Sequence, residues 1–418
     1  MGHGRRLIVL SGMKQALFAG LLAALSVGLA ACEPLPDPEY ASPPKLEAGT
    51  PADVSPEEAL RADIEQLCEL IPERYVYYES RAKIWPQACD AAREDARDVF
   101  GPTARLAILE RLLDSLYDGH ISLGVNSMES PRLIPSGADY RVAQVGNNVV
   151  VTGVRPGWSA ANEGVQPGDI VVEINGKPPL ITALTRARDG RDVLGPERLN
   201  WALNAVAAGM RGEKRRLVVD RGGERLSFTL DRPDSEIPVK EDAPPPPQTA
   251  AVTYRMIDNS IGYIRINNSL GDMNTVPAFD EALEAMRGAT GWVIDLRDTP
   301  GGGGTSVAEP ILGRFIGRDT VYQVSYPPGV NPVDRYAFPR GPWQVEAPVA
   351  VLVGAWTGSM GEGMAIGFDG MARGRVFGSP MAGLAGGIEE FRLTASGFVV
   401  RFPTYDLRHV DGTPRPEW

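Results

Sequence analysis

The stretch AVLVGAWTGSMGE, residues 350–362, decides the fold expected for this chain. It starts as an apolar strand, passes through a short turn, and opens a helix at Ser359. Strands and helices also alternate before it, over residues 261–353. This alternation predicts an α/β domain with a mostly parallel sheet, whose functional groups lie at the carboxyl ends of the strands.

Ser359 has two possible roles. Its hydroxyl can point into a cleft from the strand–helix junction, where a base would make it a nucleophile. However, the Ser-x-x-Glu pattern that begins at Ser359 also matches a capping box, in which the hydroxyl binds a helix N–H and is inert. This segment by itself does not separate the two interpretations.

A glycine-rich segment favours the interpretation of Ser359 as a nucleophile over that of a helix cap. The sequence VIDLRDTPGG at 293–302 runs from a buried strand into two glycines, and only glycine lets a backbone amide approach a substrate so closely. A serine nucleophile needs donors for the oxyanion that it creates. We therefore predict an oxyanion hole made by the N–H of Met360 and by that of Gly301 or Gly302.

Three segments together resemble the tail-specific (C-terminal-processing) and tricorn-core serine peptidases. They are Asp-Leu-Arg-x-x-x-Gly-Gly at 295–302, Thr-x-Ser-x-x-Glu at 357–362, and Asp-Gly-His at 118–120. They occur in the order that the family has, between about residue 60 and the C-terminus. The resemblance implies a peptidase core of the crotonase-like or ClpP-like kind, an acyl-enzyme on Ser359, and no cofactor.

His120 is the predicted general base. Many tail-specific peptidases use a lysine after the serine, but this chain has no lysine after Lys240. Of the three histidines, His3 lies in the targeting segment and His409 lies outside the family motif, whereas His120 matches it. A neutral imidazole suits a base at neutral pH. The alternative is a turn histidine without a role.

The resemblance also suggests the acid that orients the base. The tricorn-core family places a glutamate about 58 residues after its serine, and Glu417 fits both this spacing and the Gly-x-x-x-x-Glu context at 412–417. Glu417 is the penultimate residue, and such positions are often frayed. Three other acids therefore stay open as substitutes: Glu390, Asp406 and Asp411.

A β-rich region precedes the core. A β-prone run at 148–154 leads into GWSAANEGVQPGD at 157–169, and Ile-Asn-Gly follows at 174–176. This pattern resembles the bacterial type of PDZ domain, which binds peptides by strand addition. The only candidate for its carboxylate-binding loop is the segment 135–141.

The N-terminus predicts an exported lipoprotein. Residues 16–31 are apolar, follow basic residues, and end in Leu-Ala-Ala-Cys, which resembles a bacterial lipobox with Cys32 as the acylated residue. The apolar run is shorter than the roughly 20 residues that span a bilayer. An ordinary signal peptide is the alternative. We expect a lipid-anchored envelope protein, with Glu33 favouring the outer membrane, facing the periplasm.

The net charge and the cysteines limit which partners, disulfides and metal sites the sequence predicts. The net charge of −11 becomes −14 once the three basic residues of 1–31 are removed, which excludes nucleic acid as a partner. An oxidising compartment favours a disulfide between Cys68 and Cys89, although two buried thiols are the alternative. Neither cysteine has metal-ligand spacing, so no metal is predicted.

The sequence therefore predicts a multidomain α/β protein: an envelope-anchored serine endopeptidase that cleaves proteins or peptides, with its PDZ domain presenting or gating the substrate. Two rivals share the fold, a carrier of hydrophobic ligands like the photoreceptor retinoid-binding protein and an inactive peptide-binding module. The oligomeric state is left open. The expected parts are a signal peptide at 1–31, a flexible tether at 32–55, a helical domain at 56–130, a PDZ domain at 131–232, a Pro-rich linker at 233–250 and the peptidase core at 251–418.

Overall fold

The computed structural model describes residues 54–186, 195–231 and 250–418. The predicted signal peptide, Cys32 and most of the Pro-rich linker lie outside these ranges. Within them, no helix combines the length and the apolar character that crossing a membrane requires.

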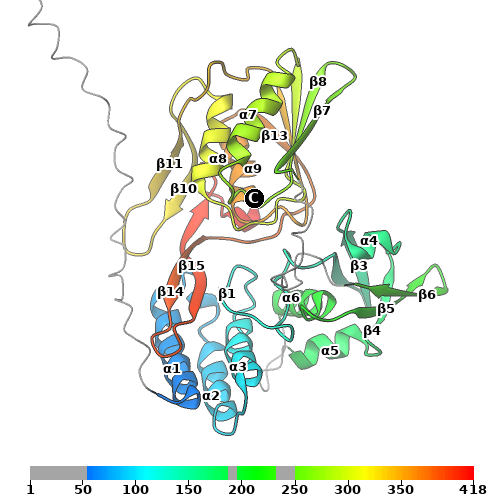
Figure 1. Cartoon of the computed structure of the whole chain (residues 1–418), viewed down its shortest axis with the longest axis vertical. Helices are drawn as coiled ribbons and strands as arrows, with labels where there is room; N and C mark the ends of the chain where they lie inside the picture. Colours follow the sequence, from blue (N-terminus) through cyan, green and yellow to red (C-terminus); the bar gives the residue numbers. More distant parts are fainter. Residues whose placement is uncertain (1–53, 187–194, 232–249) are drawn as a thin grey trace, which may run out of the picture. The chain divides into compact units, whose positions relative to one another are not determined.

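Three α-helices form the N-terminal part (Figure 1): α1 (Pro56–Arg74), α2 (Trp85–Asp95) and α3 (Pro102–Asp114). Helix α1 begins with a complete capping box, because Ser55 Oγ accepts the N–H of Glu58 and the Glu58 carboxylate accepts the N–H of Ser55. Cys68 of α1 and Cys89 of α2 form a disulfide. This bond ties the first two helices together and limits the freedom of the unfolded chain.

The PDZ domain is built on an antiparallel sheet with strand order β2-β3-β4-β5-β6. Buried side chains of its strands form one apolar cluster with the helices. The elements are β2 (Tyr140–Val145), β3 (Asn148–Val154), α4 (Ser159–Asn162), β4 (Ile170–Ile174), α5 (Pro179–Arg186), α6 (Pro196–Ala208), β5 (Arg215–Arg221) and β6 (Glu224–Leu230).

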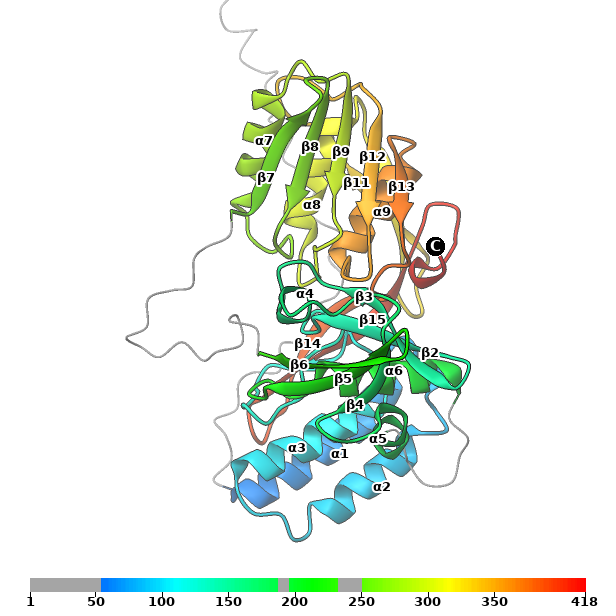
Figure 2. The same ribbon diagram turned by 90° about the vertical axis from the view of Figure 1, so that its right-hand side faces the viewer.

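The α/β core is centred on a sheet with strand order β13-β12-β9-β8-β7, which Figure 2 shows side by side. All its pairs are parallel except β7 with β8, so the predicted mostly parallel sheet is confirmed. Its elements are β7 (Val252–Ile257), β8 (Ile261–Ile266), α7 (Thr275–Ala285), β9 (Gly291–Asp295), α8 (Thr305–Leu312), β12 (Val349–Val353), α9 (Met360–Gly370) and β13 (Gly374–Gly378).

A third sheet joins the core to the N-terminal helices. It contains β10 (Thr320–Tyr326), β11 (Val333–Ala337), β14 (Gly387–Arg392), β15 (Val399–Arg408) and the short β1 (Ser122–Leu123). Phe391, Val400 and Phe402 of the last two strands pack into the apolar cluster of α1, α2 and α3. These three residues were expected in the peptidase core at 251–418, but they form part of the apolar core of the N-terminal helices.

This third sheet positions the functional site. Strand β1 pairs with β15, with Ser122 opposite Arg401 and Leu123 opposite Val400. His120 lies just before β1 in the sequence. The pairing therefore anchors the segment that carries His120 to the C-terminal strands.

Candidate active site

Ser359 lies at the sharp turn between β12 and α9, with φ 51° and ψ −113°. Residues other than glycine seldom adopt a positive φ, and such strained backbone is concentrated at functional sites. The turn places Ser359 before the first residue of α9, Met360.

The Ser359 hydroxyl faces His120. Its Oγ lies 3.0 Å from Nε2 of the His120 ring, which is hydrogen-bonding distance. The Glu362 carboxylate accepts the N–H of Ser359 at 2.7 Å, and the Ser359 side chain faces the N–H of Glu362, which is the arrangement of a capping box. The same hydroxyl therefore lies within reach of a base and of the first turn of the helix.

His120 is held in a defined orientation. Its ring is buried, and Nδ1 lies 2.7 Å from the carbonyl oxygen of Ala385. A carbonyl can only accept, so Nδ1 carries the proton and Nε2 is free to accept from Ser359. Burial lowers the pKa of His120, and this outweighs the opposing effects of the Ala385 carbonyl and Asp118. The imidazole is therefore neutral at pH 7, as a base must be.

Glu417 does not fill the orienting role expected for it. It is exposed in the 3₁₀ helix η4 (Arg415–Glu417), and the Nδ1 proton of His120 is already taken by Ala385. The substitutes are engaged elsewhere: Glu390 with Arg401, Asp406 with Tyr77 and Arg408, and Asp411 with His409 and Thr413. In this structure a backbone carbonyl, and not a carboxylate, meets Nδ1 of His120.

The loop after β9 carries the glycines to the nucleophile. Thr357 Oγ1 donates to the Leu296 carbonyl at 2.7 Å, and the N–H of Gly358 donates to the Thr299 carbonyl at 2.9 Å. A Cβ added at Gly301, whose φ is +105°, would lie only 3.0 Å from Ser359 Cβ. The close approach and the positive φ together require glycine at this position.

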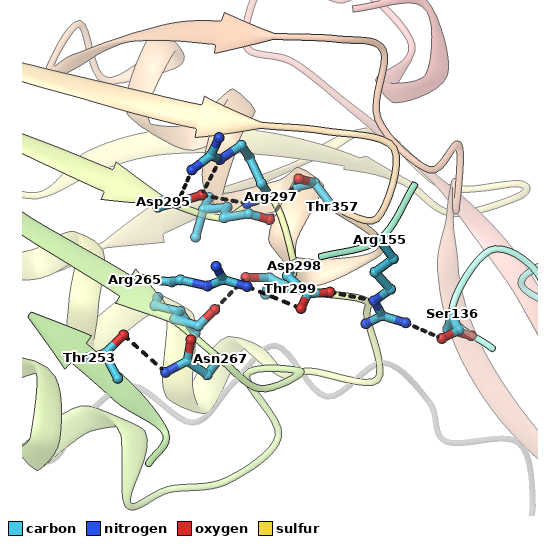
Figure 3. A network of polar contacts seen from close by, with 12 residues as sticks. Ser136, Arg155, Thr253, Arg265, Asn267, Asp295, Arg297, Asp298, Thr299 and Thr357 are labelled. Carbon is cyan, nitrogen blue, oxygen red and sulfur yellow. Dashed lines mark hydrogen bonds and ion pairs between the residues drawn. The ribbon is translucent and has the colours of Figure 1, made fainter. Parts of the chain in front are cut away.

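Ion pairs brace the same loop. Asp295 is fully buried and accepts two hydrogen bonds from the Arg297 side chain, at 2.9 and 2.7 Å. Figure 3 shows Asp298 between Arg265 of β8 and Arg155 of the PDZ domain, at 3.2 and 2.6 Å. The loop is thus fixed from both the core and the PDZ domain.

Amide groups are available beside the Ser359 hydroxyl. Met360 is the first residue of α9, and the first N–H groups of a helix have no partner within it. Across the described part of the chain, no backbone carbonyl accepts the N–H of Met360, Gly301 or Gly302. These are the three residues predicted for the oxyanion hole.

The candidate carboxylate-binding segment of the PDZ domain faces the peptidase core. Arg141 donates to the Ala355 carbonyl at 3.2 Å, and Trp356 Nε1 donates to the Ala138 carbonyl at 2.8 Å. Arg141 and residues 382–385 line a cavity of about 390 Å³ beside Gly119. The cavity therefore begins next to the catalytic histidine candidate.

Metal ligands do not gather anywhere in the described ranges: no group of three or more His, Cys, Asp or Glu side chains there could hold an ion. The polar side chains around Ser359 instead bind backbone groups and one another. Acid–base chemistry is what this arrangement can supply.

Three residues at this site were not predicted in their roles. Ala385 orients the base through its carbonyl, Glu362 was considered only as a capping partner, and Arg415 donates to the Ser359 carbonyl at 3.1 Å. Every residue has a carbonyl, so Ala385 leaves no trace in the sequence. The buried character of Glu362 and Arg415 likewise depends on the folded chain.

Known proteins match this chain in two regions. Residues 260–417 match peptidase family S41, and residues 150–189 match the PDZ domain. Carboxy-terminal processing protease CtpA of Bacillus subtilis (strain 168) is 27% identical over 232 residues, which are 55% of this chain and 43% of that protein. The chain thus covers less than half of that relative's length.

Solved structures share the fold. The photosystem II D1 C-terminal processing protease has a TM-score of 0.53 at 15% identity, covering 87% of this chain and 91% of the other. Mature CPAF has a TM-score of 0.57 at 12% identity, covering 86% and 91%. The helices, PDZ domain and α/β core therefore form a known arrangement.

Proposed function

Because residues 260–417 of this chain belong to peptidase family S41, we propose that the protein is a serine endopeptidase acting on proteins or peptides through an acyl-enzyme. The observation that carries the proposal is the 3.0 Å separation between Ser359 Oγ and His120 Nε2. Such a pair is the minimal unit of nucleophile and base.

The reaction starts with proton transfer. Ser359 Oγ attacks the substrate carbonyl carbon while Nε2 of His120 takes the hydroxyl proton, and the same proton then goes to the leaving amine. Water then attacks the ester carbon while His120 takes one of its protons, and this proton returns to Ser359 Oγ as the ester bond breaks. The Ala385 carbonyl keeps the imidazole in the tautomer that the first step needs and stabilises the imidazolium through Nδ1–H.

The oxyanion is stabilised by backbone amides. Met360 follows Ser359 in the chain, Gly301 approaches Ser359 closely, and the N–H groups of Met360, Gly301 and Gly302 have no backbone acceptor among the described residues. Fixed donors of this kind act where the negative charge develops. The ion pairs around Asp295 and Asp298 keep the glycine loop in place during the reaction.

A phosphonate that reacts only with activated serines tests the function. The protein is incubated with the probe, digested, and the modified peptide is identified by mass spectrometry. We expect a single label, on Ser359, together with cleavage of an unfolded protein substrate that the probe blocks. An unlabelled protein, or a label on another serine, would contradict the proposal and favour a binding protein on the same fold.

The proposal includes an envelope location. Cys32 lies in a lipobox-like sequence outside the described residues, and residues 32–55 would link the lipid to α1. We expect Cys32→Ser to leave an uncut precursor or to release the protein from the membrane fraction. The mass of the mature N-terminal peptide checks this, and a mature start other than residue 32 contradicts it.

A further inference from the structure

Glu362 is a buried acid whose carboxylate binds the backbone N–H of the nucleophile, Ser359. It lies in the first turn of α9 and is 1% exposed. A buried carboxylate is costly unless it is hydrogen-bonded. Its partners therefore show what holds it there.

Both Glu362 oxygens bind backbone N–H groups, and these come from two distant segments. Oε2 accepts from Ser359 at 2.7 Å and from Leu384 at 3.1 Å, while Oε1 accepts from Gly383 at 2.8 Å. Gly383 and Leu384 belong to the connection between β13 and β14. The carboxylate therefore ties this connection to the backbone of the nucleophile.

The same connection orients the base. Ala385, the next residue, supplies the carbonyl that binds Nδ1 of His120 at 2.7 Å. The Glu362 carboxylate thus binds the backbone of the nucleophile directly. It is connected to the base through Leu384, which it binds, and Ala385, the residue after it. In a Ser-His-Asp triad the acid contacts the imidazole itself. Here the acid acts on the imidazole only through the backbone of residues 383–385.

Charged groups on other elements surround Glu362. Arg415 of η4 is fully buried, donates to the Ser359 carbonyl at 3.1 Å and to Gln323 Oε1 at 2.8 Å, and attracts the carboxylate. The negative charge of Glu362 also attracts the guanidinium of Arg141 in β2 and opposes the lowering of the Arg141 pKa by burial. Burial raises the pKa of Glu362 to about 7, although Arg415 and the three N–H groups oppose the rise.

We propose that Glu362 is the positioning acid of this site, which holds the Gly383–Leu384 backbone against Ser359 and so fixes the Ala385 carbonyl that orients His120. This inference rests on the proposed peptidase function. This role of Glu362 differs from that of a helix cap. A cap would stabilise α9 only, whereas a positioning acid also controls the orientation of the His120 ring.

The test is Glu362→Gln in the full chain. The amide keeps the shape of the side chain, but its NH₂ replaces one accepting oxygen and faces a backbone donor. The Ala385 carbonyl then shifts, and misplacement of about 1 Å can cost about 10²-fold in rate. We expect kcat for peptide cleavage to fall by about 10²-fold with KM nearly unchanged.

The pH profile is the second readout and needs no variant. Protonated Glu362 loses an acceptor, so kcat of the unaltered protein should decline as the pH falls through about 7. His120, whose pKa is lowered by burial, should titrate below its ordinary range. Glu362→Gln should remove the limb near 7 and leave only the lower limb of His120. A single limb below the ordinary histidine range in the unaltered protein would overturn the proposal.

Asp280→Asn is the matched control. Asp280 is a partly buried carboxylate of α7 that pairs with Arg314 and Arg340, and it makes no contact with the site. We expect a lower melting temperature with unchanged kcat and pH profile. If Glu362→Gln behaves the same way, Glu362 is only a helix cap. An unaltered protein that fails to react with the phosphonate would instead refute the peptidase function itself.

Discussion

Replacing Ser359 by alanine is expected to abolish peptide cleavage and phosphonate labelling while leaving the protein folded. The reason is that the Ser359 hydroxyl lies 3.0 Å from the base, whereas the other hydroxyl of the β12–α9 turn, that of Thr357, donates to the Leu296 carbonyl. The fold should survive the change, because losing the capping contact at the start of α9 costs only about 1 kcal/mol. Turnover and melting temperature, measured on one preparation, check the expectation.

Ser55→Ala is the matched control for this variant. Ser55 also precedes a helix and forms a capping box with a glutamate three residues later, its hydroxyl accepting the N–H of Glu58 at 3.2 Å, but it has no histidine beside it. Its removal should cost about 1 kcal/mol of stability and leave turnover unchanged. An active, destabilised Ser359→Ala protein would show that Ser359 is only a cap, and the mechanism would fail.

Replacing His120 by alanine is expected to lower kcat by roughly 10⁴- to 10⁶-fold. No lysine follows Lys240, so the core has no second amine base. Nucleophile and base act as a unit, so Ser359→Ala combined with His120→Ala should be hardly slower than either alone. Steady-state rates of the three variants on one peptide substrate measure this non-additivity.

His409→Gln provides the comparison for His120→Ala. His409 is also buried, but it pairs with Asp369 and Asp411 and stacks on Trp418. Its loss should affect the C-terminal strand and not the rate. If His120→Ala kept its activity while His409→Gln lost it, the assigned base would be wrong.

The strands of the core sheet were recognisable from the sequence to different degrees. Strands β8, β9 and β12 are apolar runs, because a parallel sheet is buried on both faces. Strand β15 contains Pro403, which cannot donate to a ladder, and β14 holds two consecutive glutamates. Their place beside the N-terminal helices comes from distant apolar partners, which local sequence patterns do not report.

By itself the sequence determined which residue types could carry the chemistry. Ser359 at a strand–helix junction, the glycine pair 301–302 and His120 follow from intrinsic properties: a nucleophilic hydroxyl, a backbone free to adopt positive φ, and an imidazole that titrates near neutrality. The tertiary structure decided which acceptor meets Nδ1 of His120. Ala385 lies 265 positions away and uses a carbonyl that every residue has, so only the folded path of the chain selects it. The same holds for Glu362, because a helix-capping pattern and a buried positioning acid have one sequence and differ only in what surrounds them.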